Sequence, residues 1–577
     1  MRSHLKRLLL AAIDKAVQRG ELPLEAPPVL LESPKQREFG DLASNVAMLW
    51  AQKAKRSPRA IAQSILKHLE DPEALLERKE VAGPGFLNFA FAPKFYYQQL
   101  RALAAGNEQA PDLGAGRRVQ IEFASVNPTG PLHVGHGRVA VIGDVLARLH
   151  EATGYRVERE YYVNDAGNQM DHLAVSIYLR YRELLGERIE FPPEGYPGEY
   201  VKEIAAAIQA QHGAAFLEVP QEEALRFFRD YGGDFLLNGI REDLAAFGIR
   251  FDSFFSEKEM RRKNEVAATI EHLRARGLIY SHEGAEWFRS TAFGDDKDRT
   301  LVKSDGELTY FASDIAYHRS KFERGFDGLI NVWGADHHGY VARIKAAIQA
   351  LGFDPARLRV VLVQMVQLTR GGEPVRMGKR TGEFVSLREV LEEVGRDAAR
   401  FFFLMRKADS HLDFDLDLAK RQSTENPVFY AQYAHARIAS IFEQAAKVGR
   451  LPPEEALRNP PAERLELRDE LELIREVIRF GDVLEESVSE LEPHRLVFYL
   501  LELAGAFHRY YNRTRVLTDD DELTQARLAL ALAVQATIRK GLGILGVEAP
   551  VKMAARLEAE TRDSDATSIE NVYGRKP

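Results

Sequence analysis

The spacing of hydrophobic residues changes along the chain and divides it into regions. Apolar residues recur at helical intervals over 5–17, which predicts an amphipathic helix near the N-terminus. Two further helices are predicted within 42–69, separated by Pro58, and alternation over 86–91 predicts a strand. We therefore expect a small α+β domain over 1–108, followed by a linker rich in Gly, Pro and polar residues.

The pattern after the linker is typical of an α/β domain. Apolar and polar residues alternate over 119–123, the stretch from Gly137 to about Glu151 has helical spacing, and 155–163 predicts a second strand. A strand, a helix and a strand in this order indicate a parallel sheet. Further strands are predicted at 279–289, 308–311, 329–333 and 360–366. We assign 109–385 to this domain, with a helical insertion at about 170–280.

The last part of the chain has mostly helical patterns. From Leu387 onward strand patterns nearly vanish, and residues 420–550 predict a helical bundle. We assign 386–553 to this α-helical domain and 554–577 to a polar tail. The fold class expected from these patterns is multidomain α/β.

Composition adds mainly exclusions. The chain has 577 residues, 45% hydrophobic and 28% charged, as folded proteins of several domains do. Its net charge of −8 means that any nucleic acid must bind to local basic patches. The absence of cysteine excludes disulfides, thiol catalysis and cysteine-bound zinc. No apolar stretch approaches the ~20 residues that span a membrane, and the N-terminal apolar run is too short for a signal peptide, so we expect a cytoplasmic protein without membrane contact.

The first chemical signal lies between the strand at 119–123 and the helix that follows. It is the run His133-Val134-Gly135-His136-Gly137, with the helix expected to begin at the second histidine. A helix N-terminus offers unpaired N–H groups and partial positive charge to an anion. Two histidines three residues apart share one face of the first turn and can donate hydrogen bonds to phosphate oxygens. Gly135 leaves room for a flat ring against the backbone. The run predicts a phosphate site.

Two other interpretations of this segment stay open. Residues 135–140 satisfy G-x-G-x-x-A, and Glu158 and Glu160 follow about 20 residues later, as in dinucleotide-binding oxidoreductases. That fingerprint should follow its strand immediately, whereas residues 124–134 intervene here. The second interpretation is a helix capped by histidines without any ligand.

Residues 122–136 (EFASVNPTGPLHVGH) resemble the HIGH signature of class I aminoacyl-tRNA synthetases, in the form seen in arginyl-tRNA synthetases. Other segments are similar to parts of the same family. They are 39–47 in its N-terminal additional domain, 310–314 and 333–338 in its active site, 376–380 at its Lys-Met-Ser-Lys signature, and 430–437 at the start of its anticodon-binding domain. The chain departs from the second signature at Arg376 and Gly378, which replace the first lysine and the serine.

The resemblance implies a Rossmann-like catalytic domain, an N-terminal domain that contacts tRNA and a C-terminal anticodon-binding bundle. It implies that L-arginine is activated by ATP to arginyl-adenylate and passed to the 3′ end of tRNA(Arg). It also implies Mg²⁺ with the ATP, no zinc, and a monomer.

The same resemblance assigns roles to individual residues. The residues implied in catalysis are His133, His136 and Lys379. Those implied in ATP binding are Pro131, His133, Gly135, His136, Met377 and Lys379. Those implied in arginine binding are Glu122, Asn127, Tyr310, Asp314 and His337. Those expected at the tRNA are Tyr430, Arg437, Arg509 and Arg513, because aromatic rings stack on unpaired bases and arginines meet phosphates.

Simpler interpretations of these residues stay open. The alternative for Glu122 is a solvent-facing strand residue, for Asp314 the N-cap of a helix over 315–322, and for the aromatic residues of the last domain a place in the core. Another class I synthetase, or a tRNA-binding relative without activity, also remains open. Retention of His133, His136 and Lys379 argues against the inactive relative.

Overall fold

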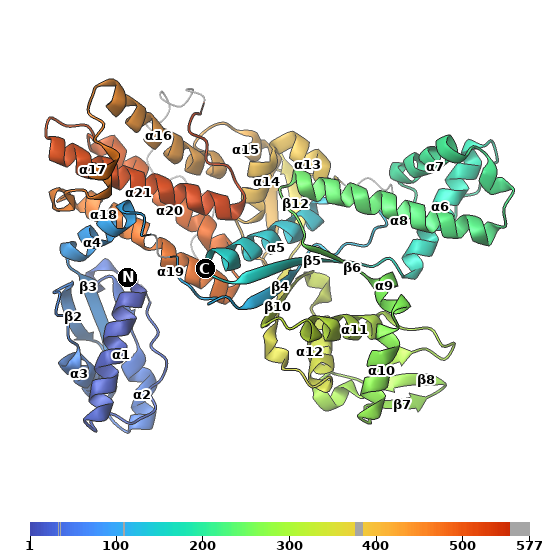
Figure 1. Cartoon of the computed structure of the whole chain (residues 1–577), viewed down its shortest axis with the longest axis horizontal. Coiled ribbons are helices and arrows are strands. Elements are labelled where there is room, and N and C mark those ends of the chain that lie inside the picture. Colours follow the sequence, from blue (N-terminus) through green and yellow to red (C-terminus); the bar gives the residue numbers. More distant parts are fainter. Residues whose placement is uncertain (33, 35, 108–109, 376–384, 554–577) are drawn as a thin grey trace.

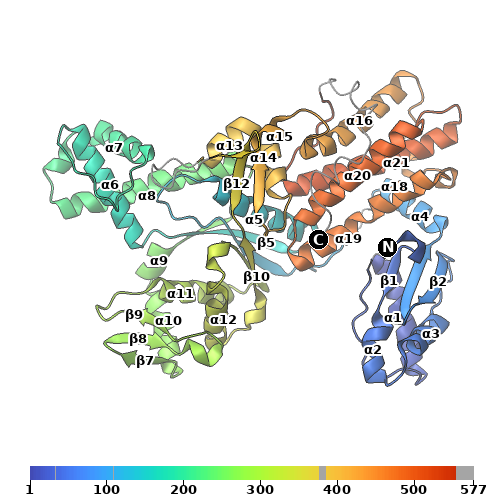
Figure 2. The ribbon, with the colours of Figure 1, turned by 180° about the vertical axis from the view of Figure 1, so that it is seen from behind.

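The computed structural model describes residues 1–32, 34, 36–107, 110–375 and 385–553. The second signature at 376–380 and the tail at 554–577 lie outside these residues. Figure 1 shows an elongated molecule with the central sheet in its middle. The N-terminal domain and the helical bundle lie at one end, and a helical arm lies at the other, as the reverse view in Figure 2 confirms.

The N-terminal domain has the expected α+β composition. Its elements are α1 (Arg2–Gln18), β1 (Leu42–Ser44), α2 (Val46–Ala54), α3 (Pro58–His68), β2 (Leu76–Ala82), β3 (Phe86–Phe91) and α4 (Pro93–Ala104). The sheet is antiparallel, in the order β1-β3-β2. The prediction of a helix from Leu42 was wrong for its first turn, because Leu42 pairs with Phe89 of β3. Strand β2 was missed because its side chains are largely exposed and carry no apolar alternation.

The central sheet is parallel, as the strand–helix–strand pattern predicted, and confirms the Rossmann-like fold class. Its order is β11 (Leu358–Val363), β10 (Gly328–Gly334), β4 (Arg118–Glu122), β5 (Arg156–Val163) and β6 (Ser253–Ser256). The helices that bear on the site are α5 (Val134–Ala152), α11 (Tyr310–Glu323) and α12 (Tyr340–Ala350). Because all five strands run the same way, their carboxyl ends meet at one edge, where open α/β sheets bind ligands.

Helix α5 lies unusually close to the sheet at Gly143. A Cβ atom built on Gly143 would lie 2.1 Å from Cγ of Phe123, the residue that follows β4. Phe123 is fully buried between the helix and the sheet. The position of α5 is therefore set by direct contact between the helix backbone and a core ring.

The helical insertion is shorter than expected. Its helices α6 (Asn168–Leu184), α7 (Glu199–His212) and α8 (Gln221–Ala246) share their own hydrophobic core and form the projecting arm in Figure 1. The predicted range of 170–280 wrongly included β6, which is an edge strand of the central sheet. Four residues are too short to give a recognisable alternation.

A second correction concerns the segment before α11. The predicted strand at 308–311 is the N-terminus of α11, with Thr309 as its N-cap. The local sheet is formed instead by β7 (Ile279–His282), β8 (Ala285–Phe288) and β9 (Arg299–Val302). Helices α9 (Glu257–Arg262) and α10 (Glu265–Ala275) pack beside α11.

The C-terminal part is a helical bundle, reached through a short connecting layer. That layer contains β12 (Val366–Arg370), α13 (Leu387–Val394), α14 (Arg396–Phe403), β14 (Leu412–Asp415) and α15 (Leu416–Lys420). The bundle consists of α16 (Pro427–Lys447), α17 (Glu454–Arg458), α18 (Arg468–Ile478), α19 (Phe480–Glu490), α20 (His494–Arg513) and α21 (Asp521–Leu545). By length and composition alone α21 is apolar enough to cross a membrane, contrary to the expectation from sequence, but 67% of its apolar window is buried inside the protein. It is the core helix of the bundle, in contact with α16 and α20.

Candidate active site

The two signature histidines form a reciprocal cap at the start of α5. The helix begins at Val134, so His133 is the N-cap, and the expected start at the second histidine was wrong. Nδ1 of His133 accepts hydrogen bonds from the backbone N–H groups of Gly135 (3.1 Å) and His136 (3.3 Å). The N–H of His133 in turn donates to Nδ1 of His136 at 3.3 Å. An imidazole nitrogen thus takes the place that a serine or aspartate oxygen usually occupies.

This cap determines the chemical form of both rings. Because each Nδ1 accepts a hydrogen bond, the neutral ring carries its proton on Nε2 and can donate from there. Burial lowers the pKa of His133, and burial together with the neighbouring His133 lowers the pKa of His136 to about 3. The rings stack with their centroids 3.4 Å apart. The pair therefore presents two neutral rings rather than two cations.

Two other predicted ATP contacts adjoin this cap. A Cβ on Gly135 would lie 3.0 Å from Cε1 of His133. The flat ring that lies against the backbone at Gly135 is therefore the imidazole of His133. Pro131 is half-buried just before the cap. The backbone of Leu132 accepts from the N–H of Leu387 at 2.8 Å, and His133 forms an antiparallel bridge with Ser386. The chain that follows the second signature is therefore in direct contact with the first, while Met377 and Lys379 are outside the described residues.

Arg138 holds the same helix from its buried side and was not predicted. Its guanidinium is fully buried and donates to the backbone oxygens of Gln364 (2.9 Å), Lys407 (2.9 Å) and Ser410 (2.8 Å). These acceptors lie more than 220 residues away in sequence. The signal in the sequence was a lone arginine in an otherwise apolar part of the helix.

Glu122 lies at the carboxyl end of β4 in a buried ionic network. Its Oε2 accepts from Nζ of Lys321 at 2.5 Å, and Oε1 accepts from the hydroxyl of Ser125 at 3.1 Å. The interpretation of Glu122 as a solvent-facing residue is wrong, because the residue is 5% exposed. Lys321, on α11, also donates to Oδ1 of Asn331 on β10 at 3.0 Å. Lys321 and Asn331 were missed because nothing local in the sequence distinguishes them.

Asp314 lies in the second turn of α11 rather than at its start. The N-cap interpretation is wrong, since Thr309 caps this helix. The hydroxyl of Tyr340, on α12, donates to Oδ2 of Asp314. Burial, helped by the nearby carboxylates of Glu257 and Glu122, raises the pKa of Asp314 to about 7. Three carboxyl groups around one half-buried position suit a cationic ligand.

A hydrogen-bonded chain links Asp314 to Glu122. The backbone oxygen of Asp314 contacts Nδ1 of His318 at 2.8 Å, and Nε2 of His318 lies 2.9 Å from Nδ2 of Asn331. Asn331 reaches Glu122 through Lys321. Two predicted arginine ligands that are 192 positions apart in the sequence therefore share one network.

The remaining predicted arginine ligands lie around this network. Tyr310 is half exposed at the start of α11, and its hydroxyl would lie 2.8 Å from a Cβ on Gly167. Asn127 donates to Oε1 of Gln169 at 2.6 Å. His337 is exposed, with its ring 6.4 Å from that of Tyr340. Tyr340 thus adjoins both Asp314 and His337, although the sequence did not point to it.

The candidate tRNA contacts fall into two kinds. Arg437 lies over the rings of Tyr433 (4.5 Å) and Tyr511 (5.0 Å), and the Tyr430 ring lies 4.8 Å from that of His508, all between α16 and α20. Arg509 and Arg513 are exposed on α20, although Nη1 of Arg513 is 3.9 Å from Asp469. The exposed pair is the better placed to meet phosphates.

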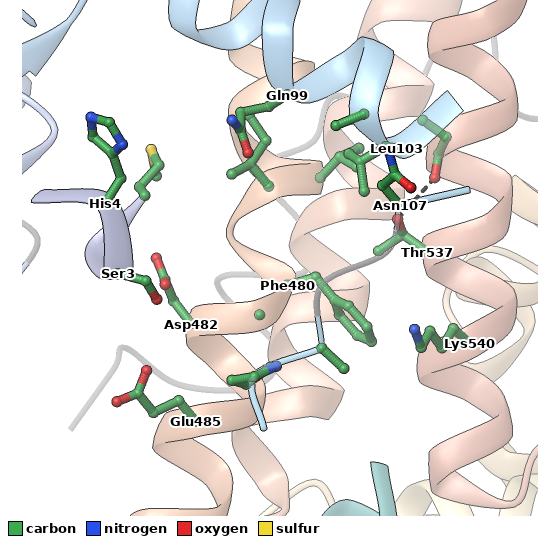
Figure 3. A pocket seen from close by; sticks show the side chains of 18 of the residues that line it. Ser3, His4, Gln99, Leu103, Asn107, Phe480, Asp482, Glu485, Thr537 and Lys540 are labelled. Carbon is green, nitrogen blue, oxygen red and sulfur yellow. Dashed lines mark hydrogen bonds between the residues drawn. The ribbon is translucent and has the colours of Figure 1, made fainter. Parts of the chain in front are cut away.

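A cavity of about 740 Å³ lies away from all these residues. It is lined by α1, α4, α18, α19 and α21, where the N-terminal domain meets the bundle, and it is open to solvent. Figure 3 shows His4 and Asp482 on one side of it and Thr537 and Lys540 on another. None of the predicted site residues lines it. The candidate active site is therefore marked by its chemistry and its place on the sheet rather than by cavity size.

Family models match successive parts of the chain. Residues 3–91 match the arginyl tRNA synthetase N terminal domain, 99–438 the catalytic domain of class I (R) tRNA synthetases, and 431–553 the DALR anticodon binding domain.

Individual relatives agree with these models. The arginine–tRNA ligase of Geobacter sp. (strain M21) is 50% identical over 557 residues, which cover 96% of this chain and 100% of that protein. That of Syntrophotalea carbinolica is 50% identical over 556 residues, with the same coverage. The solved arginyl-tRNA synthetase of Thermus thermophilus superposes with a TM-score of 0.76 over 95% of this chain and 100% of that one, and its 23% identity supports the fold alone. The chain therefore belongs to the arginyl-tRNA synthetases, a family of class I aminoacyl-tRNA synthetases, and is an arginine–tRNA ligase.

Proposed function

We propose that the edge of the parallel sheet holds two adjacent subsites that share the ligase reaction. The histidine pair binds the α-phosphate of ATP, and the network around Asp314 binds L-arginine. The observation that carries the proposal is the carboxyl group of Asp314, half-buried among other acids and held by Tyr340.

The phosphate subsite acts through neutral donors. The carboxylate of arginine attacks the α-phosphorus, and pyrophosphate leaves with the electron pair of the broken P–O bond. Donors on Nε2 of His133 and His136 stabilise the negative charge that develops on the phosphate oxygens, without first losing or gaining a proton. Pro131, Gly135 and Met377 contact the ATP, and Lys379 neutralises the leaving pyrophosphate.

The arginine subsite selects a planar cation. The guanidinium pairs with the carboxylate of Asp314, with Tyr310 and His337 beside it, because a carboxylate matches the guanidinium fork. Glu122 and Asn127 hold the amino and carboxylate end of the substrate. Since Lys321 pairs with Glu122 and Arg261 pairs with Glu257, Asp314 is the carboxyl group of the three that has no cationic partner among these pairs.

Mg²⁺ enters with the nucleotide in this proposal. Within 1–375 and 385–553, apart from the few undescribed positions, no group of three or more His, Asp or Glu side chains is arranged to hold a metal ion. Mg²⁺ commonly binds through substrate phosphates and water rather than in a protein cage, so we assign it to the ATP substrate.

The transfer half of the reaction uses the bundle. Arg509 and Arg513 contact tRNA phosphates, and Tyr430 and Arg437 belong to the aromatic cluster beside them, where unpaired bases can stack. We also propose domain boundaries at about residues 108, 385 and 553. The proposal further includes a monomeric state and a cytoplasmic location.

Asp314→Asn tests the arginine subsite. The variant keeps the shape but leaves a buried guanidinium without its counterion, which costs about 2–5 kcal/mol, so KM for arginine should rise by roughly two orders of magnitude while KM for ATP changes little. Steady-state aminoacylation should also accept canavanine, which keeps a guanidinium-like group, and reject lysine and citrulline. Glu323→Gln, at an exposed ion pair on the same helix, is the matched control. An unchanged KM for arginine in Asp314→Asn would refute the assignment.

A further inference from the structure

Arg400 lies where four separate parts of the molecule meet. It belongs to α14, and its side chain is fully buried. Nε donates to the backbone oxygen of Leu545 at 2.8 Å, Nη1 to that of Phe247 at 3.0 Å, and Nη2 to Oδ2 of Asp144 at 2.5 Å. Leu545 ends α21, Phe247 follows α8, and Asp144 lies within α5. One guanidinium therefore joins the bundle, the insertion and the histidine-bearing helix.

The two backbone contacts are charge-assisted caps. The last carbonyls of a helix have no intrahelical partner and carry partial negative charge, which a cation stabilises. Arg400 caps the ends of both α21 and α8. The chain turns sharply over the guanidinium after α21, where Gly546 has φ of 70° and an added Cβ would lie 2.4 Å from Nη2. The bundle is thus anchored to Arg400 at the end of its core helix.

The third contact reaches the helix of the signature. Asp144 is two turns after His136 on α5 and is 1% exposed. Nε of Arg148 also donates to Asp144 at 2.8 Å, while Nη2 of Arg148 reaches the backbone oxygen of Gly248 at 3.1 Å. Helix α5 packs against both α14 and α21. A shift of the end of α21 relative to α14 would therefore strain the bonds that hold α5.

A buried ion pair is an inefficient way to stabilise the contact between these elements. Buried ion pairs contribute little net stability compared with apolar side chains of the same volume, but their fixed bond directions specify one relative arrangement of the elements they join. The joined elements here are the anticodon-binding bundle and the helix that bears the phosphate-binding histidines.

We propose that Arg400 is a positioning residue that couples tRNA docked on the bundle to the histidine pair, by joining the end of α21 to Asp144 of α5. The proposal rests on the role proposed above for His133 and His136. Correct docking of the anticodon on the bundle then favours the arrangement of α5 in which the histidines face the reacting phosphate. A correct anticodon should therefore raise kcat as well as the affinity for tRNA.

Two variants test this coupling. Asp144→Asn keeps both helix caps and removes the charged link to α5, and Arg400→Lys keeps the charge but cannot make three bonds in fixed directions. The measurement is kcat and KM for aminoacylation of tRNA(Arg) and of the same tRNA with a substituted anticodon. Allosteric couplings typically change the affected quantity 5- to 150-fold. We therefore expect the kcat for tRNA(Arg), divided by the kcat for the tRNA with the substituted anticodon, to fall at least about fivefold in both variants. KM for tRNA should change little.

The matched control is Arg396→Gln. Arg396 lies one turn earlier on α14, is partly exposed, and forms its ion pairs with Asp397 of the same helix and with Glu548 just beyond α21. This variant should keep the wild-type ratio. A merely structural role for Arg400 would lower both kcat values equally and leave the ratio unchanged, and that result would overturn the proposal. A wild-type enzyme whose kcat is indifferent to the anticodon would overturn it as well.

A measurement on the wild-type protein keeps the coupling refutable even if Arg400→Lys does not fold. Hydrogen exchange of α5 amides should slow when tRNA(Arg) is added and slow less with the substituted anticodon. Equal protection by both tRNAs would refute the coupling. Failure of the histidine assignment would appear separately, as near-normal activity of His136→Ala.

Discussion

The histidine pair and the proposed arginine pocket occupy the same edge of one sheet but are built in opposite ways. The histidine pair comes from a single run of residues and is held by backbone N–H groups. The arginine pocket combines β4, β10, α11 and α12 and is held by charged and polar side chains. A subsite held by backbone hydrogen bonds can be built from neutral side chains. A subsite built from buried charges is destabilised when any one of its partners is removed.

Lys321→Met should give the largest effect, because it breaks the charge balance of the pocket. It leaves Glu122 buried without its counterion, and such losses cost about 3–5 kcal/mol, so the free energy of unfolding should fall by that amount in urea denaturation. The double variant Lys321→Met with Glu122→Gln should recover part of the loss. Lys202→Met, at the exposed pair with Glu199, serves as the control. A stability equal to wild type would mean that the pocket is not held by this pair.

His136→Ala and His136→Asn should separate structure from chemistry in the histidine pair. The side-chain oxygen of asparagine can replace Nδ1 as the acceptor for the N–H of His133, but asparagine lacks the donor on Nε2. Loss of one such donor costs about 10²–10³ in rate, so both variants should lose kcat by this factor, while KM for ATP changes much less. Only the alanine variant should also lose thermal stability. Normal turnover in the asparagine variant would exclude the donor role.

The pH dependence of arginine binding should show that a charged carboxylate, Asp314, binds the substrate and that the histidine pair stays neutral. Because the pKa of Asp314 is about 7 in the arginine-free enzyme, binding to the carboxylate form requires loss of a proton below that pH. KM for arginine should therefore rise about tenfold per unit as the pH falls from about 7 to 5, and level off above 7. His136, with a pKa of about 3, adds no transition in this range. The dependence should disappear in Asp314→Asn, and its persistence there would assign the proton to another group.

Tyr340→Phe should give the smallest change. It removes one hydrogen bond to Asp314, worth about 0.5–1.5 kcal/mol, so KM for arginine should rise about two- to tenfold and the midpoint of its pH profile should move upward. Tyr280→Phe removes another Tyr–Asp bond, to Asp298 at 3.0 Å, which involves neither Asp314 nor Tyr340, and should leave both quantities unchanged. An unshifted midpoint in Tyr340→Phe would show that this hydroxyl does not stabilise the carboxylate.

The same contrast explains how much the sequence could predict. Strand β4, helix α5 and strand β5 were predicted to within a few residues, because apolar periodicity and the signature are local properties. Strands β2 and β6 were missed because exposure or shortness removes the alternation. Lys321, Tyr340 and Arg400 could not be predicted, since their partners lie on other helices and strands and no local pattern marks a buried polar contact.

The close contact at Gly143 limits variation in a way that the chemistry of the site does not reveal. Even one methyl group there would overlap the ring of Phe123, so any other residue would lift α5 from the sheet. The histidines would move with the helix, although Gly143 touches neither of them. Random mutagenesis of α5 should therefore return clones of reduced activity at Gly143, a position that meets no substrate.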